Sequence, residues 1–249
     1  KAGFAGVQIH GAHGYLVSQF LSPRHNVRED GWGGTPEKRR RFVLELYAAM
    51  RAQVGADFPI GIKLNSADFQ RGGFTEEESL ATIKALADAG IDLIEISGGT
   101  YEAPAMTGVK ASTIEREAYF LTFAETVRQH ISTPLMVTGG FRTLAVMQAA
   151  LDSGALDLIG LGRPLAIEPD AANRLLAGEE MRYRVKPIKT GIGMVDRMAI
   201  MEVSWYTRQL HRMGNGKAPK PNESGLWSFA ATVVANVRGT VKTRRMRAS

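Results

Sequence analysis

Two imidazoles and a phenol lie close together near the start of the chain. His10, His13 and Tyr15 follow the short apolar run 6–9, which predicts a β-strand, so we expect the three side chains on the turn after it. Such groups can hydrogen-bond an oxygen atom and move a proton. Taken alone, the pair also fits a polar core histidine with a packed tyrosine. Histidines without a carboxylate cluster make a poor metal site, and we expect no metal.

Lys63 is a second group with chemical potential. In the run 59–65, Ile60, Ile62 and Leu64 alternate with Gly61, Lys63 and Asn65, so the ammonium faces the side of the strand opposite the aliphatic side chains. A buried ammonium without an anionic partner is costly. The partner could be Glu95 on a neighbouring strand or a bound anionic group. The amine could also form a Schiff base in an aldolase or isomerase.

Two glycine-containing turns could bind a phosphate. Gly139 and Gly140 precede a helix that starts at Thr143, and Gly162 with Arg163 follows the next strand. Glycines let backbone N–H groups approach a phosphate, and a helix N-terminus adds a favourable dipole. A single Gly-Gly is usually only a turn. Two such turns on consecutive units, with an arginine, favour a phosphate site.

These groups need a scaffold, and the chain supplies strands and helices in alternation. Such an alternation predicts a parallel sheet with the site at the carboxyl ends of its strands. The predicted strands are 6–9, 59–65, 93–97, 134–138 and 157–161. The predicted helices start, in chain order, at Thr35-Pro36, at Thr75, near Glu115 (to His130), at Thr143 and at Pro169. The segment 100–113 is expected to be a long loop.

Composition narrows the function. The chain of 249 residues is 44% hydrophobic and has no Cys, which excludes disulfides, thiolate metal sites, iron–sulfur clusters and a cysteine nucleophile. Redox chemistry would therefore need a bound cofactor. No apolar run is long enough for a membrane helix and no signal-peptide pattern is present, so we expect a soluble cytoplasmic protein with no membrane contact.

Charge divides the chain. Residues 1–181 carry 17 positive and 22 negative side chains, a net of −5, whereas residues 182–249 carry 14 and 3, a net of +11. The second segment predicts two helices, 192–213 and 227–241. We expect this basic helical C-terminal extension to pack on the acidic body through aromatic side chains rather than to bind nucleic acid, because it has no recognisable binding motif.

A longer signature surrounds the imidazoles. It comprises His10-x-x-His13-x-Tyr15, Ser22-Pro23, Asn26-x-Arg28-x-Asp30, Gly33-Gly34, and Arg39 with Arg41-Phe42. It resembles the old yellow enzyme family of FMN-dependent ene-reductases, and the resemblance continues to about Pro169. It implies a TIM-type (β/α) barrel that is incomplete, with five of eight βα units over residues 1–181, and FMN with NADH or NADPH as reductant.

The resemblance also implies roles for the residues above. His10 and His13 would hydrogen-bond the carbonyl oxygen of an enone or enal, and Tyr15 would protonate the α-carbon. Lys63 would lie against the N1 and C2-oxygen side of the flavin. Its phosphate would be held at a set of backbone and side-chain donors: Gly139, Gly140, Gly162 and Arg163.

Two other functions stay open from the residues. The chain could be a phosphate-binding barrel aldolase or isomerase that uses Lys63, or a catalytically inactive interaction module that uses its basic, aromatic C-terminal segment. Five parallel strands also leave two open sheet edges. We therefore expect the isolated 249 residues to bind FMN poorly and to associate, for instance as a homo-oligomer.

Overall fold

The computed structural model describes residues 2–100, 117–180, 188 and 200–235. Parts of four predicted segments lie outside these residues: almost all of the loop 100–113, the start of the helix near Glu115, the start of the helix 192–213, and the end of the helix 227–241. The chain forms two compact units, residues 1–161 and residues 162–249.

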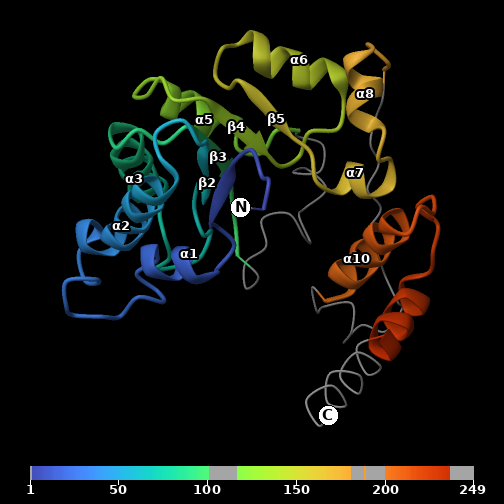
Figure 1. The fold of residues 1–249 in the computed structure, drawn as a ribbon, viewed down its shortest axis with the longest axis horizontal. Coiled ribbons are helices and arrows are strands. Elements are labelled where there is room, and N and C mark those ends of the chain that lie inside the picture. The colour runs from blue at the N-terminus through green and yellow to red at the C-terminus, as the bar shows by residue number, and fades with distance from the viewer. Residues whose placement is uncertain (1, 101–116, 181–187, 189–199, 236–249) are drawn as a thin grey trace. The chain divides into compact units, whose positions relative to one another are not determined.

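The first unit is built on a parallel sheet of five strands in chain order (Figure 1). The strands are β1 (Val7–Gly11), β2 (Ile60–Asn65), β3 (Leu93–Ser97), β4 (Leu135–Thr138) and β5 (Leu158–Gly160). All five predicted strands and their parallel pairing are confirmed. In this sheet β1 and β5 are the edges, as expected.

Helices connect the strands of this unit. They are α1 (Leu16–Leu21), α2 (Pro36–Val54), α3 (Glu76–Asp88), α5 (Leu121–Arg128) and α6 (Leu144–Asp152). The hydroxyl of Thr35 accepts a hydrogen bond from the Lys38 N–H and caps α2, which has Pro36 at its first position. Thr75 and Glu78 form the capping box predicted for α3.

The two faces of the sheet differ in chemistry. One face carries Ile60, Ile62 and Leu64, which are fully buried. Each such side chain contributes about 1.5–3 kcal/mol to stability. The other face, here called the inner face, carries the polar residues of the alternation. Because the period of a strand is two, the same pattern that builds the core aims Lys63 away from it.

Register aligns polar residues across the inner face. His10 pairs with Lys63, Lys63 with Glu95, and Glu95 with Met136. Residues that pair in register lie on the same side of the sheet. One row across four strands therefore contains an imidazole, an ammonium and a carboxylate.

The prediction that a helix starts near Glu115 is wrong for the residues described. Helix α5 begins at Leu121, and Ala118 has a φ of 54°, which a helix does not tolerate. Glu117 is also held elsewhere, because its carboxylate accepts the N–H groups of Arg142 and Thr143. A contact with a distant turn thus outweighs the local helical pattern.

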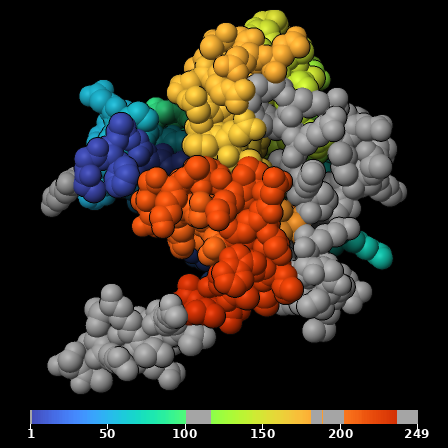
Figure 2. Space-filling model, turned by 90° about the vertical axis from the view of Figure 1, so that its right-hand side faces the viewer, coloured from blue at the N-terminus to red at the C-terminus, as the bar shows by residue number. Residues whose placement is uncertain are grey.

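The second unit is helical. It contains α7 (Arg163–Ile167), α8 (Ala171–Leu176), α10 (Ile200–Gly214) and a helical segment at residues 225–235. Trp205 is buried, and its indole N–H donates to the Glu223 carbonyl at 2.9 Å. Trp227 is 60% exposed. Figure 2 shows α10 and the segment 225–235 in orange and red. In the described part of the chain, no helix is both long and apolar enough to cross a bilayer.

Candidate active site

The first turn after β1 brings the predicted catalytic residues together. His10 is the fourth residue of β1, His13 lies in the turn, and Tyr15 is the N-cap residue of α1. The ring centroids of His10 and His13 are 5.3 Å apart, and those of His10 and Tyr15 are 5.1 Å apart. Two imidazoles and a phenol therefore form one cluster at the carboxyl end of β1.

The backbone of His13 is held in an uncommon conformation. Its φ is 63°, in the left-handed region, which is strained for a residue with a side chain. Its N–H donates to Asn65 Oδ1 at 3.2 Å, and its Nε2 lies 3.0 Å from Ser97 Oγ. Both partners are buried at the carboxyl ends of the next two strands. The neighbouring strands thus fix where this imidazole points.

The environment keeps both imidazoles neutral. Burial, and after it the positive charge of Lys63, lowers the pKa of His10. The same two causes, with a smaller effect of His10, lower the pKa of His13 to about 4, and the Glu95 carboxylate opposes the shift only in part. A neutral imidazole has one N–H donor and one acceptor. At neutral pH these two side chains can donate a hydrogen bond to an oxygen without carrying a charge.

Lys63 has a carboxylate partner. Its Nζ lies 2.5 Å from Glu95 Oε1, and both side chains are largely buried. Glu95 was one of the two partners that the sequence suggested for Lys63, and the structure contains this ion pair. Glu95 Oε2 also accepts the side-chain N–H of Gln8 at 2.8 Å. Burial raises the pKa of Glu95, but the hydrogen bonds from Lys63, Thr138 and Gln8 together bring it below its usual value.

Two glycines make room for this polar row. Gly61 pairs with Gln8, and a Cβ at Gly61 would lie 3.7 Å from Gln8 Cγ and 3.3 Å from the Leu93 carbonyl. Gln8 on β1 therefore passes over β2 to reach Glu95 on β3. Gly160 pairs with Thr138, and a Cβ there would lie 1.7 Å from Thr138 Oγ1. Gly160 is required for Thr138 to fit, whereas a Cβ at Gly61 would be in ordinary contact with Gln8 and tight only against the Leu93 carbonyl.

The rest of the signature holds the loop after α1. Ser22 Oγ donates to Asp68 Oδ2 at 2.7 Å, and the Asn26 amide donates to the Phe20 and Trp32 carbonyls. Arg39 Nε donates to the Leu21 carbonyl at 3.0 Å, and its guanidinium also pairs with Glu78. These residues are structural supports. They hold the loop after α1 in place.

The turn at Gly139 and Gly140 already contacts an anion of the chain itself. Their φ values are 142° and 86°, which only glycine adopts readily. Glu117 Oε2 accepts the N–H groups of Arg142 at 2.8 Å and Thr143 at 2.9 Å, at the start of α6. A phosphate bound here would therefore use other donors of the turn. The assignment of the flavin phosphate to Gly139 and Gly140 stays a prediction.

Gly162 and Arg163 lie at the start of the second unit. Gly162 is the N-cap residue of α7, and a Cβ there would have no neighbour within 4 Å. An Arg163 guanidinium nitrogen lies 3.8 Å from a Glu202 carboxylate oxygen on α10. Within this unit the two residues keep open space and a positive charge next to each other, which suits the predicted phosphate contact.

Three residues near the site had no role assigned from the sequence: Ser97, Gln8 and Glu117. Ser97 lies two residues after Glu95 and Gln8 lies two before His10, so the period of two places each on the inner face. This alternation could have identified Ser97 and Gln8 as residues of the site. Glu117 had no such signal, because its contact with the turn at 142–143 spans 25 residues.

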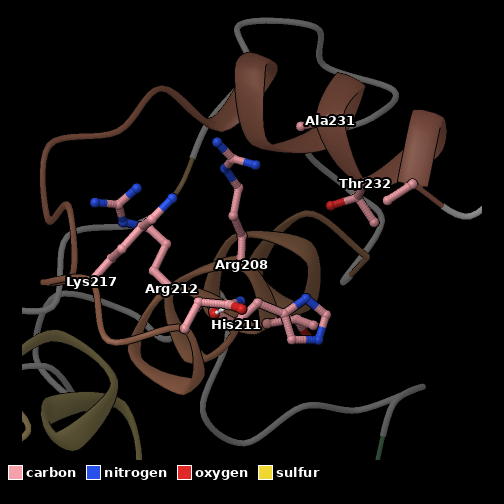
Figure 3. Close-up of a pocket in the computed structure, with 9 residues that line it drawn as sticks. Arg208, His211, Arg212, Lys217, Ala231 and Thr232 are labelled. Atoms are coloured by element: carbon pink, nitrogen blue, oxygen red, sulfur yellow. Dashed lines mark hydrogen bonds between the residues drawn. The ribbon is translucent and has the colours of Figure 1, made fainter.

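A groove in the second unit contains none of the predicted site residues. It has a volume of about 320 Å³ and lies between α10 and the helical segment 225–235 (Figure 3). Arg208, Arg212 and Lys217 give it a positive lining, although Arg208 also pairs with Glu223 and Arg212 Nε donates to the Ala218 carbonyl. Among the residues that the structure describes, no group of three or more His, Asp or Glu side chains is placed to hold a metal ion.

Comparisons with known proteins agree on one family. The model of the NADH:flavin oxidoreductase / NADH oxidase family matches residues 1–181. The chain is similar to the NADH-dependent flavin oxidoreductase iccE of Talaromyces variabilis, with 45% identity over 179 residues, which are 68% of this chain and 42% of that protein.

Solved structures show the same similarity. A 2-naphthoyl-CoA reductase in complex with 2-naphthoyl-CoA matches 71% of this chain and 27% of its own, with a TM-score of 0.66 and 32% identity. The old yellow enzyme homologue from Zymomonas mobilis matches 74% of this chain and 49% of its own, with a TM-score of 0.58 and 27% identity. The chain thus spans less than half the length of each of these three proteins.

Proposed function

Because the chain belongs to the NADH:flavin oxidoreductase / NADH oxidase family, which includes the old yellow enzymes, we propose that it reduces the activated C=C bond of α,β-unsaturated carbonyl compounds. The observation that carries the proposal is the cluster of His10, His13 and Tyr15 beside Lys63. The five-stranded sheet with its helices is part of a (β/α) barrel, and the cluster lies at the carboxyl end of its strands, where barrel enzymes build their sites.

The family implies FMN as cofactor and NADH or NADPH as reductant. No side chain donates hydride, and FMN would supply it when bound. The donor set of the inner face fits this cofactor. The Lys63 ammonium has three N–H donors, one of which goes to Glu95, so it can also hold the N1 and C2-oxygen side of a flavin.

The two imidazoles would bind the carbonyl oxygen of the substrate. Each can donate one hydrogen bond as a neutral ring, and donors aimed at an oxygen that gains negative charge stabilise the transition state. Ser97 holds Nε2 of His13, which leaves the other ring nitrogen to be directed by the turn. The imidazoles would thereby polarise the C=C bond conjugated to the carbonyl.

Tyr15 would supply the proton. Its side chain is 46% exposed and its ring contacts that of His10, so a phenolic O–H lies beside the carbonyl-binding group. Proton transfer to the α-carbon completes the reduction. In an enone the α-carbon is bonded to the carbonyl carbon. A proton donor next to the carbonyl-binding imidazole therefore suits this substrate.

The Schiff-base alternative receives less support. A lysine that attacks a carbonyl needs a free amine, and the Lys63 side chain is instead engaged by the Glu95 carboxylate in a largely buried ion pair. The proposal is tested by loading the protein with FMN and measuring NADH oxidation with and without 2-cyclohexenone under anaerobic conditions. Formation of cyclohexanone supports it. FMN binding with no product from any enone or enal would contradict it.

A further inference from the structure

We propose that Glu95 is a positioning residue that holds the Lys63 ammonium in place and offsets its charge, and so sets how strongly this site stabilises reduced flavin. The inference rests on the proposed function, in which Lys63 contacts the flavin. The role of Glu95 can be tested separately from the proposed function, by a measurement on Lys63 that needs no flavin.

Glu95 is the centre of a network that spans three strands. Its Oε1 is 2.5 Å from Lys63 Nζ on β2, and its Oε2 is 2.8 Å from the Gln8 amide nitrogen on β1. Both partners are donors, and each comes from a different strand. A carboxylate whose two oxygens are each held by a donor in this way has little freedom to turn.

Burial makes the pair interdependent. The Glu95 side chain is 7% exposed and the Lys63 side chain 16%. A charge at such depth is unfavourable without a partner, so neither side chain can leave the pair at low cost. The ammonium therefore stays beside its register partner His10, on the face that carries the catalytic cluster.

The carboxylate also limits the charge that Lys63 presents. An unpaired ammonium would favour a nearby anion strongly, whereas a paired one contributes less because its partner carries the opposite charge. Among the described residues, Glu95 is the one acceptor for which a bond from the Lys63 ammonium is seen, so two N–H donors remain for a ligand. Lys63 would thus orient a flavin while stabilising its anionic reduced form only moderately.

The test compares Glu95→Gln with Glu78→Gln. Glu78 is the carboxylate of another buried pair, with Arg39, outside the site, so its variant is a matched control for loss of a buried ion pair. In FMN-loaded protein, Glu95→Gln should raise the flavin midpoint potential by about 30 mV, a tenfold change in the ratio of reduced to oxidised flavin. Glu95→Asp keeps the charge and should restore most of the original potential. Glu78→Gln should leave the potential unchanged.

A second measurement needs no flavin. The apoprotein is treated with an amine-modifying reagent, and modification of Lys63 is followed by peptide mass spectrometry. Glu95→Gln should react severalfold faster at Lys63 than the parent or Glu78→Gln. Gln8→Leu, which removes one donor from Glu95 and no charge, should show a smaller increase and serves if Glu95→Gln does not fold.

The outcomes separate the two proposals. Equal thermal destabilisation by Glu95→Gln and Glu78→Gln, with no change in potential or in Lys63 modification, would reduce Glu95 to a structural role and overturn the inference. A protein that takes up FMN but reduces no enone or enal would count against the proposed function. The modification rate of Lys63 would still decide whether Glu95 holds the ammonium.

Discussion

The Nε2 atom of His13 lies 3.0 Å from the hydroxyl oxygen of Ser97, a fully buried residue at the end of β3. This contact links the turn after β1 to a strand that is two positions away in the sheet. It fixes the ring of one of the two carbonyl-binding candidates, and it leads to the first prediction.

Ser97→Ala should weaken the binding of a carbonyl or phenol ligand. The imidazole loses the partner that orients it, and a neutral hydrogen bond contributes about 0.5–1.5 kcal/mol, which is about 2- to 13-fold in affinity. The measurement is titration of the FMN-loaded protein with a phenol, followed by its long-wavelength absorbance. Ser228→Ala, which removes a buried hydroxyl of the second unit, is the control. Equal affinities for parent and Ser97→Ala would show that Ser97 does not orient the ring.

Tyr15→Phe should slow substrate reduction and spare the reduction of flavin by NADH. Loss of a positioned proton donor reduces a rate by about 10²–10⁴-fold. Stopped-flow measurement of the two half-reactions separates the effects. Tyr47→Phe is the control, because it removes a phenolic hydroxyl that donates to the Gly90 carbonyl at 2.6 Å, away from the site. A slower first half-reaction in Tyr15→Phe would assign Tyr15 another role.

The low pKa of His13 predicts a loss of stability in mild acid. Burial lowers this pKa from 6.5 to about 4, so the unfolded chain binds the proton more readily. The free energy of unfolding is therefore highest above pH 6.5 and falls as the pH drops from 6.5 to 4. The loss is about 2 kcal/mol once partial solvent screening is allowed for.

Urea unfolding at pH 7 and pH 5 measures this effect. His13→Asn keeps a residue that tolerates the left-handed backbone and removes the imidazole, so its stability should vary less between the two pH values. His130→Asn, at an exposed position, is the control. An unchanged pH dependence in His13→Asn would mean that His13 is not the group that titrates.

Gly160→Ala should destabilise the edge of the sheet. Its Cβ would lie 1.7 Å from Thr138 Oγ1 and 2.8 Å from Thr138 Cβ, so β4 or β5 must shift. Overpacking of this kind costs about 1–3 kcal/mol. Urea unfolding gives the loss, and Gly214→Ala, where a Cβ meets nothing within 4 Å, is the control. Adding Thr138→Gly should recover stability, and a double variant as unstable as Gly160→Ala would refute the steric cause.

Local patterns were sufficient to predict the five strands and the starts of α2, α3 and α6. Alternation in β2, the Thr35-Pro36 start of α2 and the capping box at Thr75 each act over a few residues, so the sequence displays them directly. The cluster of His10, His13 and Tyr15 was predictable for the same reason. All three belong to one strand and the turn that follows it.

What was not predictable depends on contacts between distant segments. Helix α5 starts late because Glu117 binds the turn at 142–143, and no pattern within the helix reveals this. The role of Ser97 requires knowing that His13 bends back toward β3. For Lys63, parity predicted burial and a partner, but only the structure shows that Gln8 shares the same carboxylate.

Gly61 has an effect that extends beyond its own strand. Because it lacks a side chain, the amide of Gln8 can reach Glu95 across β2. A side chain larger than that of alanine at this position would extend into the space that Gln8 crosses, and would separate the carboxylate from one of its donors. Position 61 is therefore a place where a single substitution could retune the electrostatics of the whole inner face while every charged residue stays in the sequence.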